Sequence, residues 1–108
     1  MRAEFGYAWG KLYLAILAMA TSDAPLPQRV AEAFRAHLGT LNGQNLPHFA
    51  YERLKVVRRQ LAGQLQDVDD DMTINIAPMT AKQAIAITEE IFSLYDEIAR
   101  TDALTRAS

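Results

Sequence analysis

Apolar residues recur at helical spacing along most of this chain, and the clearest run covers residues 80–102. One row of apolar side chains falls at steps of three and four residues: Ala84, Ile87, Ile91, Leu94 and Ile98. A second row beside it holds Ile85, Phe92, Tyr95 and Ala99. Together they form one broad face of a helix. Such a helix is stable only when other elements cover that face, so the pattern predicts a packed helical bundle.

The start of this helix is marked by Thr80 and Gln83, which have the spacing of a capping box. In a capping box each of the two side chains accepts a hydrogen bond from a backbone N–H that the first helical turn leaves without a partner. We therefore expect the helix to begin at Thr80.

A first helix is predicted over residues 3–21. Lys11 is its only charged residue between Phe5 and Ala20, so the helix is apolar nearly all round. We expect its inner face to hold Phe5, Trp9, Leu12, Tyr13, Ile16 and Ala20. A helix of this kind lies at the centre of a bundle or is partly covered by another chain. Gly6 and Gly10 are four residues apart on one face, and we interpret them as ordinary helix glycines rather than as a contact site.

Two more helices are predicted over residues 26–41 and 47–66, each with a proline in its first turn or just before it. The apolar side of the second helix holds Leu26, Val30, Ala33, Phe34, His37, Leu38 and Leu41. The apolar side of the third helix holds Ala50, Leu54, Val57, Leu61 and Leu65. Its outer face is predicted to hold Arg53, Lys55, Arg58, Arg59 and Gln60.

The remaining segments complete the predicted fold. Residues 73–78 form an extended connector with Ile74 and Ile76 tucked onto the bundle, and residues 103–108 are expected to fray. Two short connections and one longer one favour an all-α, antiparallel, up-down-up-down four-helix bundle. A chain of 108 residues corresponds to a single domain.

The charge is unevenly divided. Residues 29–59 carry six basic residues against two acidic ones, a net charge of +4, and residues 60–108 carry three basic against nine acidic ones, a net charge of −6. Either the basic third helix and the acidic fourth attract each other within the bundle, or the chain offers two opposite patches to a partner or to a second copy.

No pattern in the sequence indicates catalysis, a metal or a cofactor. The chain has no cysteine, and its two histidines, His37 and His48, lack the spacing of a ligand pair. The acidic run over residues 67–71 fails as a calcium loop, because Met72 and Pro78 stand where the loop needs glycine and glutamate. We therefore expect a protein that is not an enzyme.

The first 20 residues also have superficial features of a secretory signal, including Ala18-Met19-Ala20 at the place of a cleavage site. The uncharged run is short, and Glu4 lies in the region that should be basic. It is also too short to span a membrane. We expect a cytoplasmic protein without a membrane segment.

Several short segments carry a resemblance: Trp9-Gly10-Lys11-Leu12-Tyr13, Ala20-Thr21-Ser22, Gln28-Arg29-Val30-Ala31 and Leu94-Tyr95-Asp96. With these segments the chain resembles short, uncharacterised helical proteins of proteobacteria over most of its length. The resemblance implies that residues 5–21 belong to the folded domain. It implies no function and no site residue.

These observations favour a small interaction or regulatory module that binds another protein, with a homodimer as one form of that binding. The self-interface would then involve Phe5, Trp9, Leu12 and Ile16. The alternative is a regulator that binds nucleic acid through Arg53, Lys55, Arg58 and Arg59. A third hypothesis is a small hydrolase or nuclease whose site shows no recognisable motif.

Overall fold

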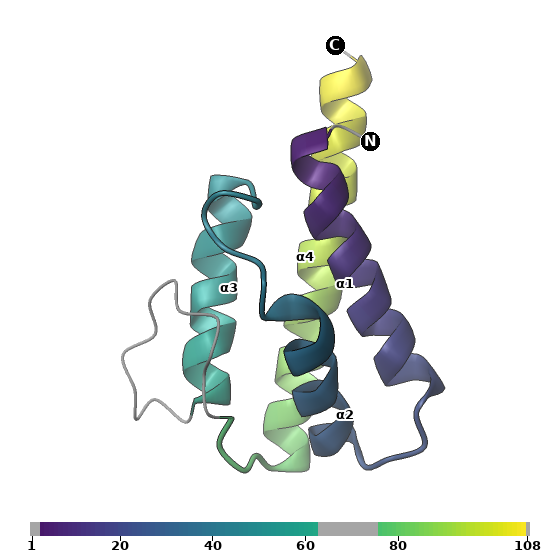
Figure 1. Cartoon of the computed structure of the whole chain (residues 1–108), viewed down its shortest axis with the longest axis vertical. Helices are drawn as coiled ribbons and strands as arrows, with labels where there is room; N and C mark the ends of the chain where they lie inside the picture. The colour runs from purple at the N-terminus through teal and green to yellow at the C-terminus, as the bar shows by residue number, and fades with distance from the viewer. Residues whose placement is uncertain (1–2, 63–75, 108) are drawn as a thin grey trace.

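The computed structural model describes residues 3–62 and 76–107, with side chains over residues 6–62 and 76–101. All its elements are helices: α1 (Ala3–Thr21), α2 (Leu26–Ala33), a π-helical turn η1 (Phe34–Leu38), α3 (His48–Leu61) and α4 (Ala81–Ala107) (Figure 1). Because η1 continues α2, the helices form four rods, and the predicted all-α four-helix architecture is confirmed.

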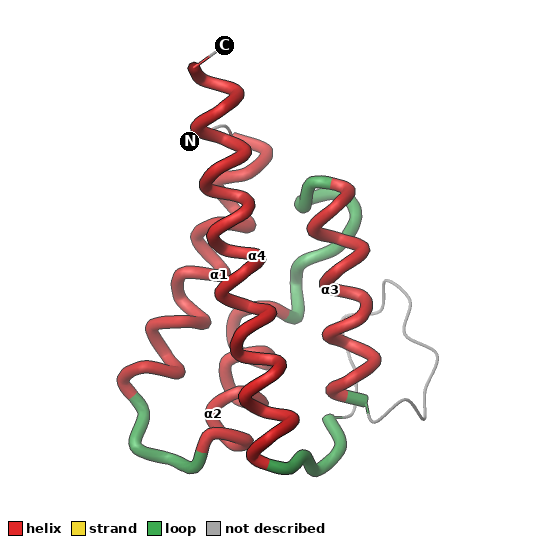
Figure 2. The backbone as a smooth tube through the Cα atoms, turned by 180° about the vertical axis from the view of Figure 1, so that it is seen from behind, coloured by secondary structure: helices red, strands yellow, loops and turns green. Residues whose placement is uncertain are grey.

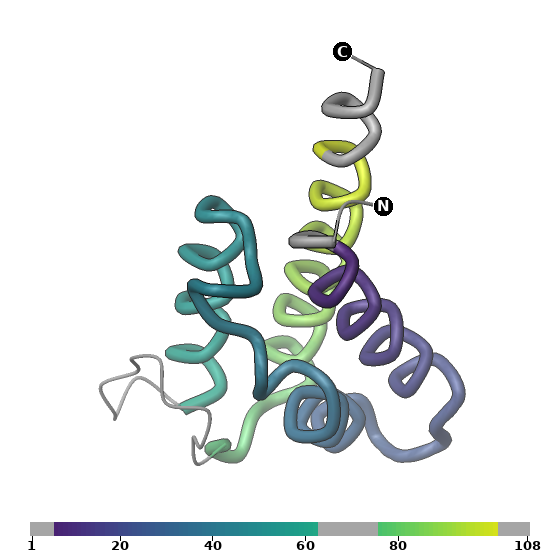
Figure 3. Tube along the Cα trace, turned by 45° about the horizontal axis from the view of Figure 1, so that its top comes forward, coloured from purple at the N-terminus to yellow at the C-terminus, as the bar shows by residue number. Residues whose placement is uncertain are grey.

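Consecutive rods alternate in direction, as Figures 1 and 2 show. Helix α4 is the centre of the arrangement, because it packs against α1, α2 and α3. Figure 3 shows α3 on one side of α4 and α1 on the other. The nearly all-apolar α1 is therefore not the central helix, and one of its sides is left at the surface of the described chain.

The core follows the row predicted on the last helix. Ile87, Ile91, Leu94 and their neighbours in that row are at most 2 % exposed. The apolar rows of α2, η1 and α3 meet it with Val30, Ala33, Phe34, Leu38, Ala50, Leu54, Val57 and Leu61. The second row predicted on α4 is covered only in part, since Ile85 and Phe92 are each 49 % exposed.

The predicted capping box is present at the start of α4. The backbone N–H of Thr80 donates to Oε1 of Gln83 at 2.8 Å, and the backbone N–H of Gln83 donates to Oγ1 of Thr80 at 3.1 Å. The two residues thus satisfy each other's amide groups, and Thr80 stands just before the first helical residue.

The second rod ends earlier than predicted, at Leu38 instead of residue 41. Its last turn widens into η1, where the N–H of Gly39 donates to the carbonyl of Phe34, five residues back, at 3.0 Å. The chain then turns, and the side-chain oxygen of Asn45 accepts the N–H of Asn42 at 2.8 Å. These bonds replace the helical turn that the apolar spacing predicted.

The other two predicted ends also differ. Helix α3 ends at Leu61, and residues 63–66 of the predicted helix lie outside the described residues. Helix α4 continues to Ala107, past the predicted end at residue 102 and through most of the stretch expected to fray. Of the predicted connector, residues 73–75 lie outside the described residues, whereas Ile76 packs on the core as expected.

Candidate functional site

The outer side of α1 leaves large apolar side chains in contact with solvent. Tyr7, Tyr13, Leu14 and Leu17 are between 39 % and 47 % exposed. The opposite side of the same helix holds a buried row of Ala8, Leu12, Ala15 and Met19. Helix α1 therefore has apolar residues on both sides, and the described chain covers only one of them.

Gly10 lies at the centre of this outer side. It follows Tyr7 by three residues and precedes Tyr13, Leu14 and Leu17 by three, four and seven, spacings that place these side chains around it on the helix surface. A Cβ atom added at Gly10 would meet no other atom within 4 Å. Glycine inside a helix costs about 0.5–1 kcal/mol relative to alanine, and packing within the described chain does not explain that cost.

Three stacked aromatic rings connect the outer side of α1 to α4. The ring of Trp9 lies 5.7 Å from that of Tyr13 and 5.4 Å from that of Tyr95 on α4, measured between centroids. Phe92 lies one helical turn before Tyr95, and Ile85 lies two turns before Phe92. We use the name α1–α4 face for the exposed large apolar residues of these two helices together with Gly10: Tyr7, Gly10, Tyr13, Leu14, Leu17, Ile85 and Phe92.

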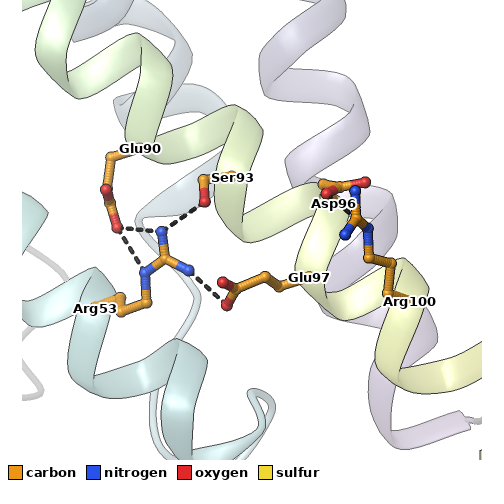
Figure 4. A network of polar contacts seen from close by, with 6 residues as sticks. All are labelled: Arg53, Glu90, Ser93, Asp96, Glu97 and Arg100. Atoms are coloured by element: carbon orange, nitrogen blue, oxygen red, sulfur yellow. Dashed lines mark hydrogen bonds and ion pairs between the residues drawn. The ribbon is translucent and has the colours of Figure 1, made fainter. Parts of the chain in front are cut away.

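The seven residues of the α1–α4 face are uncharged, but charged and polar groups stand beside them, including the exposed Glu89 between Ile85 and Phe92 on α4. The hydroxyl groups of Tyr7 and Thr40 form a hydrogen bond of 2.9 Å. The Nζ atom of Lys11 lies 5.6 Å from the centroid of the Tyr7 ring, a cation–π contact. On α4, Arg100 and Asp96 pair with each other at 3.0 Å (Figure 4).

The residues predicted for the self-interface lie mainly on the side of α1 that packs within its own chain, and the self-interface itself stays a prediction. Leu12 is 1 % exposed, and Trp9 and Ile16 are partly buried against the core of their own chain. The side chain of Phe5 lies outside the described residues. The predicted inner face was rotated from the true one, because Ala8 and Ala15 are buried while Tyr13 and Ala20 are exposed.

The basic residues predicted to share the outer face of α3 are separated by the structure. Arg53 points at α4, where its Nε and Nη2 atoms each lie 2.6 Å from Oε1 of Glu90 (Figure 4). Its Nη1 atom lies 2.5 Å from Oε2 of Glu97, and Nη2 donates to Oγ of Ser93 at 2.8 Å. At Arg53, then, the basic third helix and the acidic fourth attract each other within the bundle.

This network also changes the acid–base behaviour of Arg53. Partial burial alone would lower the pKa of its guanidinium, but the hydrogen bonds and charge attraction to Glu90 and Glu97 outweigh burial and raise the pKa above its ordinary value. The cation is held by three acceptor side chains of α4, Glu90, Ser93 and Glu97.

Arg58 was predicted on the outer face of α3, and this prediction is wrong. The side chain is 1 % exposed and donates from Nη2 to the backbone carbonyl of Leu41. Its guanidinium carbon lies 6.0 Å from the centroid of the Phe34 ring. The physical reason is that a buried arginine can satisfy the carbonyl groups of the turn after η1 while its stem packs among apolar neighbours.

The other two predicted contact residues remain on the surface. Lys55 pairs with Glu52 at 3.3 Å and lies 5.0 Å from the centroid of the Tyr51 ring. Arg59 is exposed. The four basic residues thus do not form one continuous patch on α3.

No arrangement in the described residues indicates catalysis or metal binding. No group of three or more His, Asp or Glu side chains there is placed to hold a metal ion. His48 is exposed at the first turn of α3, and His37 is half-buried in η1. A groove of about 360 Å³ lies between α2 and residues 76–79, and Arg35 is the one charged residue among the described residues that line it.

One signal in the sequence indicated the α1–α4 face. Residues 7, 10, 14, 17 and 21 follow steps of three and four, the same steps as the buried row on the other side of α1. Because both rows are largely apolar, helical periodicity alone did not show which row faces the core.

The comparisons add no relative from which a role could be transferred. None of the described helices has the length and apolar character needed to cross a membrane. Comparisons of this chain with protein-family models, with curated proteins and with solved structures found no match.

Proposed function

We propose that this protein is a small protein–protein interaction module and that the α1–α4 face is its binding surface. The observation that carries the proposal is the solvent exposure of Tyr13, Leu14 and Leu17 on a helix whose other side is fully buried. Soluble monomers rarely expose contiguous apolar patches of this kind unless the patch has a binding role.

The composition of the face supports the same function. Aromatic residues are enriched at protein interfaces, and three of the seven residues of the face, Tyr7, Tyr13 and Phe92, are aromatic. Tyr13 is already held in place by its stack on Trp9, so its ordering upon binding requires little loss of side-chain freedom.

The nucleic-acid alternative has weaker support. Phosphate binding needs several cationic groups that are free to contact a backbone. Arg53 and Lys55 are paired with carboxylates of this chain, and Arg58 is buried. Arg59 is the remaining exposed cation of the predicted set.

Site-specific photo-crosslinking in cells tests the proposed surface. A photoreactive phenylalanine analogue placed at Leu17 should give a covalent adduct with another protein chain. The same analogue at Val56, an apolar residue of α3 that is 49 % exposed, is the matched control. Adducts at position 17 but not at position 56 are expected, and the reverse pattern would place the binding surface elsewhere.

A further inference from the structure

We propose that Asn42 is a site of spontaneous deamidation, at which the folded chain presents the reacting groups to each other. Asn42 and Gly43 are consecutive residues of the loop 39–47, which connects η1 to α3. The proposal concerns a different part of the molecule from the α1–α4 face and is independent of the proposed function. It is carried by the hydrogen bonds of this loop and by its exposure to water.

The reaction needs only groups of the chain and water. The backbone nitrogen of Gly43 attacks Cγ of Asn42, so that a bond from this nitrogen to Cγ forms and the bond from Cγ to Nδ2 breaks. The Nδ2 group takes the proton of the Gly43 N–H and leaves as ammonia, and a succinimide ring remains. Water then opens the ring. Cleavage at Cγ gives aspartate, and cleavage at the main-chain carbonyl carbon gives isoaspartate, whose backbone runs through Cγ.

The backbone nitrogen of Gly43 is available for this attack. Its N–H makes no hydrogen bond within the described residues, whereas the N–H groups of Asn42 and Gln44 on either side are both bonded. Gly43 is exposed to water. Because glycine has no side chain, nothing on this residue shields the nitrogen or restricts the backbone rotation that brings it to Cγ.

The side-chain carbonyl of Asn42 is the second prepared group. Its Oδ1 atom accepts the backbone N–H of Gln44 at 2.8 Å. This bond forms an Asx turn, in which the side chain folds back over the peptide bond that follows it. Negative charge develops on Oδ1 when Cγ is attacked, and the N–H of Gln44 stabilises that charge as an oxyanion-hole donor does.

Asn45, in the same loop, lacks these features and provides an internal comparison. Its Oδ1 atom accepts the N–H of Asn42 at 2.8 Å, and its Nδ2 atom donates to the carbonyl of Thr40 at 3.0 Å. The residue that follows it is Leu46, which is branched and 9 % exposed. We therefore expect one reactive and one unreactive asparagine within this loop.

The modification would change contacts that hold the loop on the bundle. Aspartate adds a negative charge, and isoaspartate also lengthens the backbone, which removes the bond between Oδ1 and the N–H of Gln44. The residue before Asn42 is Leu41, whose carbonyl accepts the buried Arg58, and Thr40 is bonded to Tyr7 of α1. We therefore expect the isoaspartate form to unfold at a lower temperature than the unmodified chain.

Peptide mapping by mass spectrometry after incubation in mildly alkaline buffer tests the site. Aspartate and isoaspartate should accumulate at position 42 and not at Asn45. Gly43→Ala should slow the reaction about tenfold or more, because its methyl group shields the attacking nitrogen. That methyl group would lie 3.4 Å from the ring of Tyr51, so the variant should still fold, which thermal unfolding checks. Gln44→Ala keeps the backbone N–H and should react like the wild type.

A synthetic peptide of residues 39–47 separates the effect of the fold from that of the Asn-Gly pair. The peptide has the same two residues without the helices that fix the loop, so the folded chain should deamidate at Asn42 at least as fast as the peptide. A folded chain that reacts more slowly than the peptide would overturn the proposal. Equal rates at Asn42 and Asn45, or an unchanged rate in Gly43→Ala, would also overturn it.

Discussion

Arg53 on α3 and Glu90 on α4 form a forked ion pair, in which two nitrogens of the guanidinium lie 2.6 Å from the same carboxylate oxygen. Glu97, two helical turns further along α4, pairs with the third nitrogen at 2.5 Å. One side chain thereby links α3 to two successive positions on the central helix. The apolar residues Leu54, Val57 and Leu61 lie in the shared core beneath it.

Arg53→Met should lower the free energy of unfolding by about 1–2 kcal/mol. The network is partly exposed, with side-chain exposures of 27 % for Arg53 and 46 % for Glu97, so solvent screening keeps the effect well below that of a buried ion pair. A urea titration measures it. Arg59→Met on the same helix is the control, with an expected change of less than about 0.5 kcal/mol. Equal effects at both positions would contradict the structural role of Arg53.

The raised pKa of Arg53 sets the pH dependence of this contribution. A cation whose pKa is higher in the folded state contributes its full stability below the unfolded pKa, and loses it only as the pH rises through the folded value. Since the ordinary pKa of arginine already lies far above neutral pH, the stability difference between wild type and Arg53→Met should stay constant from about pH 6 to about pH 9. A difference that falls across this interval would show that another group controls the network.

Two neighbours on α4 test which side of this helix faces the core. Ile91 is fully buried and Phe92 is 49 % exposed. Ile91→Ala should cost about 2–5 kcal/mol, as removal of a buried aliphatic side chain does. Phe92→Ala should cost less than about 1 kcal/mol. Denaturant titrations measure both values, and similar losses at both positions would disprove the orientation of α4.

Truncation of the adjacent residues Arg58 and Arg59 on α3 should have very different effects on stability. Arg58→Ala leaves the carbonyl of Leu41 without the guanidinium and opens space beside Phe34, so a loss of about 2–4 kcal/mol is expected. Arg59→Ala should change stability by less than about 0.5 kcal/mol, because the side chain is exposed. Thermal unfolding of the two variants side by side measures the contrast, and an Arg58→Ala protein as stable as the wild type would contradict its place in the core.

The sequence predicted the parts of this fold in which local spacing and tertiary burial agree. The row from Ala84 to Ile98 and the capping box at Thr80 were both correct, because one face of that helix is more continuous than any other and the cap is a contact between near neighbours. Helix α1 was different. Its rows through Leu12 and through Leu14 are both largely apolar, so the contacts with α2, η1 and α4 determine which of them is buried.

Arg58 is a second residue whose burial could not be predicted from helical spacing. By spacing it belongs with Lys55 and Arg59 on a charged face, and only the turn that follows η1 brings the carbonyl of Leu41 within its reach. A contact between residues seventeen positions apart leaves no periodic trace in the sequence. The predicted basic patch was therefore wrong because a tertiary contact, between Arg58 and Leu41, buries one of its members.

The central place of α4 has a consequence for the order of events during translation. Helices α1, α2 and α3 all leave the ribosome before the helix against which each of them packs. At about 5–20 residues per second, the apolar side of α1 waits roughly 4–17 seconds for the end of α4. During that interval α2 and η1 are the described partners available to α1, and the part of its inner side that packs on α4 is uncovered. The nascent chain therefore exposes more apolar surface than the folded protein. Chaperone binding is expected to be strongest just before α4 emerges.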